Sequence, residues 1–233
     1  MPKKPADFAL IPRDAVIPWT TGLDRLYEER FGEDLWPLLP GLFFEQPGRL
    51  PRVRLRMQNL VTDRFVESYC AQTGQWCEAH GLLLTGHING EPTLHSQTQS
   101  VGDAMRAYES FGIPGIDMLC DFHEYTTAKQ AASRVRQLGK EGMLSELYGV
   151  TGWDYDFRGY KLQGDWQAAL GVTLRVPHLA WLSMHGEAKR DYPACIGYQS
   201  PWWRKYSLIE DHFARLGTVL TRGHALSRVG VIH

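Results

Sequence analysis

The chain has 233 residues, of which 43% are hydrophobic and 22% charged, and its formal net charge at pH 7 is −1. This composition excludes an intrinsically disordered chain, because the apolar residues are numerous enough to bury a core. No stretch approaches the roughly 20 apolar residues of a membrane-spanning helix. A nearly neutral chain also has no field that would draw it to nucleic acid or to an anionic membrane, so we expect neither as a partner.

The cysteines and the N-terminus bear on the compartment. Four cysteines are scattered without a CxxC pair, at Cys70, Cys77, Cys120 and Cys195. They do not form the dense pattern of a disulfide framework and so favour a reducing compartment. The basic start at residues 1–5 is not followed by an apolar segment, which argues against a secretory signal peptide. We expect a cytoplasmic protein.

The first third of the chain predicts helix and irregular structure. Residues 1–22 are rich in proline and lack periodicity. Residues 24–36 have apolar side chains at helical spacing. A longer helical pattern covers residues 51–80 and ends at Gly81, a residue typical of the position after a helix. We assign residues 1–80 to an irregular arm and a long helix that belong to a barrel.

After residue 81 short apolar runs alternate with helical patterns. The runs are residues 82–87, 116–121, 143–149 and 172–178, and the helical patterns are residues 97–111, 128–140, 160–170 and 201–220. Such alternation predicts parallel strands joined by right-handed crossovers, hence an α/β fold. No GxGxxG or Walker A pattern follows any run, which argues against a nucleotide-binding sheet. We therefore predict part of a (β/α)8 barrel of the TIM type.

Four strands make half of an eight-stranded barrel. We assign residues 81–226 to the second half, and residues 227–233, which begin like a new strand, to the start of a following domain. The expectation is that the intact protein also contains an N-terminal half-barrel and that following domain.

Each of the four apolar runs ends in a side chain that can do chemistry. These are His87, Asp121, Glu146 and His178. Because ligands of parallel α/β folds bind beyond the carboxyl ends of the strands, we expect these side chains to share one site. Aromatic residues make up 12% of the chain, and many stand beside polar residues. That mixture suits a sugar, although large aromatics also fill ordinary cores.

Several motifs carry a family resemblance. They are Ser145-Glu146-Leu147-Tyr148-Gly149, Gly152-Trp153-Asp154, Gly164-Asp165-Trp166-Gln167, Lys189-Arg190-Asp191-Tyr192-Pro193 and Pro201-Trp202-Trp203. Together they resemble large bacterial glycoside hydrolases with a (β/α)8 catalytic barrel, described as family 2-like, family 42-like or α-L-rhamnosidase-like. The resemblance covers essentially the whole chain. It implies a glycosidase acting on carbohydrate by a two-carboxylate mechanism.

The resemblance also implies roles for individual residues. Glu146, which precedes the Gly152-Trp153 element, matches the nucleophile at the end of the seventh strand, or the base if the enzyme inverts. The family's acid/base glutamate follows the fourth strand and would lie before Met1. A flavodoxin-like domain would follow the barrel. The chain departs from the family at the missing acid, so the isolated chain is either an incomplete enzyme or a non-catalytic carbohydrate-binding barrel.

Further candidates come from the residues themselves. Glu91, in Asn89-Gly90-Glu91-Pro92, is the second catalytic candidate, with substrate or ion contact and a plain turn as alternatives. Neutral imidazole both donates and accepts, which suits sugar hydroxyls. Indole rings after strands suit stacking on a sugar. The predicted substrate-binding residues are His87, Asp121, Trp153, Asp154, His178, Trp181 and His185.

We expect no obligatory cofactor, with calcium as the open alternative. Asp117, Asp121, His123 and Glu124 together offer oxygen ligands for a hard cation, and some rhamnosidase-like relatives use calcium. Solvated surface acids are the simpler interpretation of that cluster. His87, Glu91 and His95 have the spacing of a helical zinc site, but Gly90 and Pro92 interrupt the helix that this would need.

Overall fold

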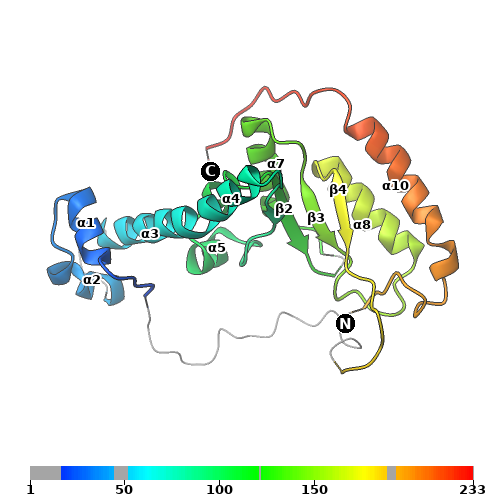
Figure 1. Cartoon of the computed structure of the whole chain (residues 1–233), viewed down its shortest axis with the longest axis horizontal. Coiled ribbons are helices and arrows are strands. Elements are labelled where there is room, and N and C mark those ends of the chain that lie inside the picture. The colour runs from blue at the N-terminus through cyan, green and yellow to red at the C-terminus, as the bar shows by residue number, and fades with distance from the viewer. Residues whose placement is uncertain (1–16, 45–51, 121, 188–192, 233) are drawn as a thin grey trace. The chain divides into compact units, whose positions relative to one another are not determined.

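The computed structural model describes residues 17–44, 52–120, 122–187 and 193–232 (Figure 1). The chain forms two compact units, Met1–Arg64 and Phe65–His233. Most of the predicted irregular arm, residues 1–16, lies outside the described residues. No helix in the described part of the chain is both long and apolar enough to cross a membrane.

The first unit is helical. It contains α1 (Leu23–Phe31), the 3-10 turn η2 (Trp36–Leu38), α2 (Pro40–Phe43) and most of α3 (Arg52–Phe65). The helix predicted over residues 24–36 ends at residue 31, because Gly32 takes a left-handed conformation there. One apolar cluster holds the unit together, with Leu23, Tyr27, Leu35, Val53, Met57 and Leu60 buried in it.

The second unit begins with two further helical segments. They are the π-helical segment η3 (Val66–Ala71) and α4 (Gln72–Ala79). With α3 they account for the helical pattern predicted over residues 51–80. Gly81 has φ +69, and the amide of Leu82 donates to the carbonyl of Cys77, which closes the helix as predicted.

A parallel sheet of four strands forms the centre of the second unit. The strands are β1 (Thr85–Gly86), β2 (Ile113–Met118), β3 (Leu144–Leu147) and β4 (Leu174–Pro177). They pair in chain order, β1-β2-β3-β4, and every pair is parallel. This confirms the predicted arrangement and gives a four-stranded half-barrel (Figure 1).

Helices connect and cover the strands. They are α5 (Leu94–Ser100), α6 (Ala104–Tyr108), α7 (Thr126–Leu138), α8 (Phe157–Leu170), the 3-10 turn η4 (Trp203–Lys205) and α10 (Ser207–Leu220). Residues 224–232 follow as chain without helix or strand. The following domain predicted from residue 227 stays a prediction.

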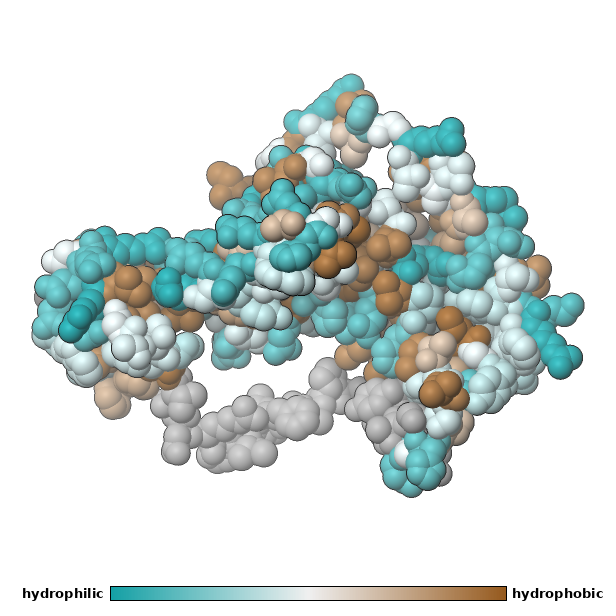
Figure 2. Space-filling view, viewed as in Figure 1, coloured by the Kyte–Doolittle hydropathy of each residue, from teal (hydrophilic) through white to brown (hydrophobic). Residues whose placement is uncertain are grey.

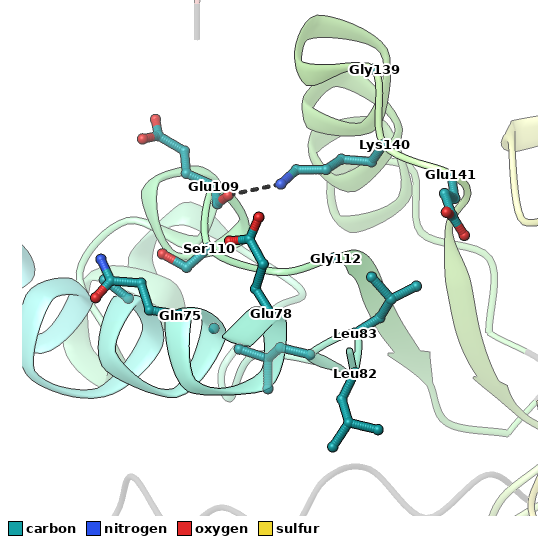
Figure 3. A pocket seen from close by; sticks show the side chains of 13 residues that line it. Gln75, Glu78, Leu82, Leu83, Glu109, Ser110, Gly112, Gly139, Lys140 and Glu141 are labelled. Atoms are coloured by element: carbon teal, nitrogen blue, oxygen red, sulfur yellow. Dashed lines mark hydrogen bonds between the residues drawn. The ribbon is translucent and has the colours of Figure 1, made fainter. Parts of the chain in front are cut away.

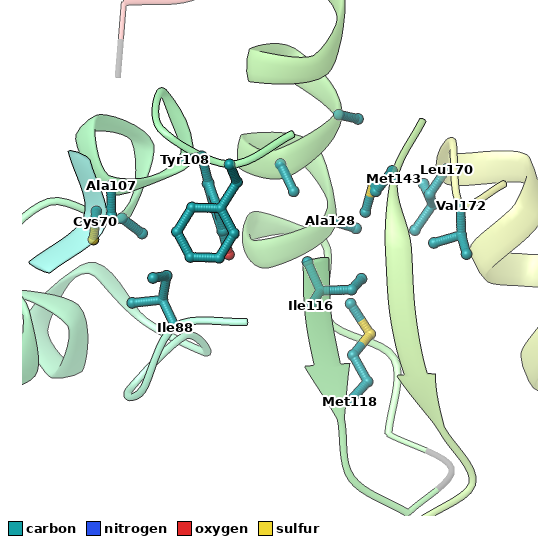
Figure 4. Close-up of a cluster of buried hydrophobic side chains, with 14 residues drawn as sticks. Cys70, Ile88, Ala107, Tyr108, Ile116, Met118, Ala128, Met143, Leu170 and Val172 are labelled. Carbon is teal, nitrogen blue, oxygen red and sulfur yellow. The ribbon is translucent and has the colours of Figure 1, made fainter. Parts of the chain in front are cut away.

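The helices pack on one face of the sheet. Ile116 and Met118 of β2 are buried with Ala128 of α7 in the main core (Figure 4). Leu147 of β3 is buried in a second cluster with residues of α8 and α10. The other face of the sheet is partly open, since Leu174 and Val176 of β4 are each 43% exposed. Figure 2 shows hydrophobic residues at the surface over this region.

Two predicted elements of the second unit are shifted or divided in the structure. The strand expected over residues 116–121 lies three residues earlier, because Ile113-Pro114-Gly115 also belongs to the sheet. The helix expected over residues 97–111 is two helices. Gly102 has φ +90 and breaks it, and the side chain of Asp103 then accepts from two amides to cap α6. The remaining strands are shorter than expected, β1 most of all.

Gly115 gives the first testable prediction. A Cβ at this position would lie 2.4 Å from the carbonyl oxygen of Gly86, so any side chain would push β1 from β2. We expect Gly115→Ala to lower the free energy of unfolding in urea by about 1–3 kcal/mol, as overpacking does. Gly217→Ala in α10 is the control, because nothing lies within 4 Å of its Cβ. It should leave stability unchanged or raise it by up to about 1 kcal/mol. Equal stability of the two variants would contradict the close approach.

Candidate functional site

Three side chains meet near the carboxyl ends of β1, β2 and β3. They are His87, which follows β1, Asp117 of β2 and Glu146 of β3. Nε2 of His87 lies 3.5 Å from Oε2 of Glu146 and 3.9 Å from Oδ2 of Asp117. One imidazole nitrogen or carboxylate oxygen from each residue lies within 4.8 Å of the corresponding atoms of the other two. Glu146 therefore lies beside His87, as the predicted shared site requires.

The sheet register explains why the two carboxylates face each other. Asp117 and Glu146 are partners across the parallel pair β2–β3, so their side chains leave the same face of the sheet. The neighbours of Asp117 along β2, Ile116 and Met118, point to the opposite face and into the core. All three site side chains remain partly exposed, at 37% for His87, 19% for Asp117 and 30% for Glu146.

The electrostatics of the site centre on Asp117. Burial raises the pKa of Asp117, and the nearby Glu146 carboxylate raises it further, because two negative charges at this distance repel. His87 and His178 act in the opposite direction. His178 thus lies close enough to Asp117 to lower its pKa. Asp117 is the carboxyl group that retains its proton more readily than an ordinary aspartate does.

Strained backbone surrounds the cluster. Cys120, Tyr148 and Val150 have φ values of +61, +77 and +63, in the left-handed region that non-glycine residues rarely adopt. Hydrogen bonds hold this conformation, among them one of 2.8 Å from the Cys120 amide to the carbonyl of Gly149. Such strain gathers at functional sites, because only a well-supported structure maintains it.

Two predicted sugar-stacking residues pack on each other. The rings of Trp153 and Trp181 lie 5.3 Å apart at 59°. Trp181 is buried, whereas Trp153 is 38% exposed and offers part of its ring to solvent. Asp154 and His185 are exposed on the loops after β3 and β4. Trp153 is therefore the indole of the pair that a ligand can reach.

Glu91 lies apart from these exposed groups. Only 3% of the residue is exposed, and its carboxylate accepts three hydrogen bonds. Oε1 accepts from the Ile88 amide at 3.0 Å and from the Tyr108 hydroxyl at 3.1 Å, and Oε2 accepts from the Asp117 amide at 2.9 Å. Burial raises the pKa of Glu91 from an ordinary 4.5 to about 7, although these hydrogen bonds lower it in part. The enclosure leaves no space for a sugar beside this carboxylate.

The three cation ligands proposed from sequence that the structure describes, Asp117, His123 and Glu124, do not form one cluster. Asp121 lies outside the described residues. The Glu124 carboxylate accepts the amides of Thr126 and Thr127 and thus caps α7. The His123 ring lies edge-on to Trp166, with 4.5 Å between centroids. Within the described ranges, one group of three or more His, Cys, Asp or Glu side chains lies close enough to hold a metal ion, and it consists of His87, Asp117 and Glu146.

Sequence reasoning placed Asp117 in the cation cluster but not with Glu146. Asp121 was expected at the end of the strand, but β2 ends at Met118, and the acid near its carboxyl end is Asp117. The signal was present in the sequence. Asp117 stands between Ile116 and Met118, and a lone acid in period-two alternation marks the open face of a strand.

A pocket lies at the opposite end of the sheet (Figure 3). It has a volume of about 400 Å³ and is lined from α4 and from the segments that precede β1, β2 and β3. Lys140 Nζ donates to the main-chain oxygen of Glu109 at its rim, at 3.1 Å. Since active sites of such barrels lie at the carboxyl ends of the strands, this pocket is separate from the cluster.

Comparisons with known proteins show similarity at the level of fold. No family model matches the chain, and no curated protein matches its sequence. Among solved structures the chain is similar to a rhamnosidase from Novosphingobium sp. PP1Y, with a TM-score of 0.69 and 18% identity over 88% of this chain. The chain spans about a fifth of that protein, 21% of its length. The fold is therefore like that of a glycoside hydrolase.

Glu91 gives a prediction of pH-dependent stability. Because its pKa is higher in the folded chain than in the unfolded one, the folded chain binds the extra proton between about pH 4.5 and 7. The free energy of unfolding should therefore fall as the pH rises from about 4.5 to 7. Above pH 7 this group should cause no further fall. The contribution is at most about 3 kcal/mol. Urea unfolding of the wild type and of Glu91→Gln across this range measures it, because other groups cancel in the difference. A difference independent of pH would contradict the assignment.

Proposed function

We propose that this chain carries a glycoside-hydrolysing site at the carboxyl ends of its strands, with Glu146 as the anionic carboxylate and Asp117 as its proton-donating partner. The observation that carries the proposal is the pairing of these two side chains, with an oxygen of each within 4.8 Å of the other, on the open face of a half-barrel. The fold shared with a rhamnosidase supports it. Carbohydrate is the expected substrate class.

The proposed chemistry needs both carboxyl groups. Protonated Asp117 donates its proton to the glycosidic oxygen as the bond to the anomeric carbon breaks. The Glu146 carboxylate attacks that carbon and forms a glycosyl ester. Water then hydrolyses the ester, and the Asp117 carboxylate takes the proton of the water. The short spacing is nearer to the ~5–5.5 Å of retaining enzymes than to the ~6.5–9.5 Å of inverting ones.

The remaining exposed groups suit recognition of the sugar. His87 lies beside both carboxylates, and its imidazole can bind a hydroxyl as donor or acceptor. We assign His178 the same kind of contact. The exposed part of Trp153 offers an apolar surface for the C–H face of a sugar ring. Asp154 and His185 would contact sugar units farther from the cleaved bond. We propose rhamnosides as the first substrates to test, since the similar structure is a rhamnosidase.

A cation-assisted site is the second candidate. His87, Asp117 and Glu146 offer one imidazole nitrogen and two carboxylates, a set that fits a divalent cation only if water or sugar hydroxyls supply further ligands. A cation bound there would orient those hydroxyls and neutralise the carboxylates. In a chain that binds sugar without cleaving it, the same set would give a calcium-dependent carbohydrate-binding barrel. Isothermal titration calorimetry with calcium measures whether the cation binds, and Glu146→Gln is the control that removes one ligand. Calcium binding that is lost in this variant favours the cation-assisted site over the first candidate.

The Glu146→Gln substitution tests the proposed nucleophile. Gln keeps the size of the side chain but cannot become an anionic nucleophile, so kcat on an aryl rhamnoside should fall by more than the roughly 10²–10⁴-fold expected for lost acid–base assistance. Sugar binding should remain. Glu141→Gln is the matched control, because it makes the same change at the other end of the sheet, and it should keep the wild-type kcat. Near-normal turnover by Glu146→Gln would refute the assignment.

Asp117→Asn tests the proposed acid. The loss of kcat should be small for a substrate whose leaving group departs without a proton, such as nitrophenolate, and about 10²–10⁴-fold for an alkyl leaving group. The comparison of the two substrates isolates proton donation from positioning. An equal loss on both would show that the acid is another group, including one in sequence beyond these 233 residues.

The stereochemical outcome is a separate prediction. The close spacing of Asp117 and Glu146 leaves no room for a water between carboxylate and sugar, so the first product formed should retain the anomeric configuration of the substrate. Proton NMR of the reaction in its first minutes distinguishes the anomers before they equilibrate. Inversion would require a more distant carboxyl partner for Glu146.

A further inference from the structure

The buried carboxylate of Glu91 joins two stretches of backbone that carry site side chains. One oxygen accepts the amide of Ile88, the residue after His87, and the other accepts the amide of Asp117 itself. We infer that Glu91 is a positioning residue, which binds the backbone of both segments and thereby sets the separation of His87 from Asp117. The kinetic consequence of this inference rests on the proposed function, whereas its structural part does not.

The carboxylate is the group that this bridge needs. Its two oxygens accept from opposite segments at 3.0 and 2.9 Å, while Tyr108 donates to the first oxygen from α6. An amide in its place would keep one acceptor and turn a donor toward the other backbone amide. That amide would then be left unsatisfied inside the protein. One of the two anchors would be lost without a change in side-chain size.

The backbone of Glu91 is itself fixed, which is what allows its side chain to hold other segments. Its carbonyl oxygen accepts from Gln97 Nε2 at 2.7 Å and from Thr127 Oγ1 at 3.0 Å. Gln97 and Gln130 exchange a reciprocal pair of amide hydrogen bonds between α5 and α7. β1, by contrast, pairs with β2 over two residues only. Glu91 therefore supplies much of the connection between the His87 segment and β2.

The test combines amide hydrogen exchange with kinetics on the 233-residue chain, both above pH 7, where the Glu91 carboxyl group is ionised. In Glu91→Gln, exchange at Ile88, Asp117 or both should accelerate by about tenfold relative to the wild type, with the rest of β2 and β3 unchanged. On the aryl rhamnoside, kcat should fall on the order of 10–100-fold with little change in KM, because misplaced groups lose transition-state contacts first. Tyr108→Phe is the matched control. It removes one donor but keeps both backbone bonds, so it should retain exchange rates and kcat.

Glu91→Asp is the second variant if Glu91→Gln does not fold. It keeps both oxygens but is one methylene shorter, so it cannot reach both amides and should give the same two effects. Unchanged exchange at Ile88 and Asp117 in either folded variant overturns the inference, whatever the activity. Loss of kcat with unchanged exchange also overturns it, since Glu91 would then act on the substrate. If exchange is faster in the variant but the wild-type chain hydrolyses no glycoside, the result supports the bridge. It then contradicts the proposed function alone.

Discussion

The parallel register of the sheet is the constraint on which the candidate site depends. Asp117 is paired with Glu146, and Glu146 with Val176, so side chains from successive strands leave the sheet on one face at one level. The opposite face is occupied by helices α7, α8 and α10, which bury the alternate residues of the same strands. Register alone thus brings together acids that lie far apart in the chain, and no loop has to fold over them to do so.

Two carboxylates on one face create an energetic problem that the surroundings reduce. Burial raises the pKa of Asp117, the repulsion from Glu146 raises it further, and the imidazoles of His87 and His178 offset part of the rise. Partial exposure limits the desolvation of the pair, whereas Glu91 is enclosed and depends on its three hydrogen-bond donors instead. The chain therefore contains two acid environments that adjoin each other in the fold: a solvated pair open to a ligand, and a buried carboxylate that accepts the backbone amide of one member of that pair.

The sequence predicted the order and direction of the strands, because helix and strand periodicities alternate clearly after residue 81. It also placed Glu146 beside His87. It misplaced β2, since Pro114 and Gly115 resemble a turn. Pro114 is tolerated because that end of β2 pairs with β1 alone, while the pairing with β3 starts at Gly115. The environment of Glu91 could not be predicted, because its donors at Tyr108 and Asp117 stand 17 and 26 residues later.

The even spacing of the strand pairs has a consequence for folding. Thr85 meets Ile113, Asp117 meets Glu146, and Glu146 meets Val176, each after a nearly equal length of chain. Each new pairing closes a loop of about 30 residues, so the entropy lost at each step is nearly the same and none spans the whole unit. The sheet can therefore grow one strand and helix at a time along the chain, with no single closure much costlier than the others. Synthesis from the N-terminus would let β2, β3 and β4 each find the preceding strand already made.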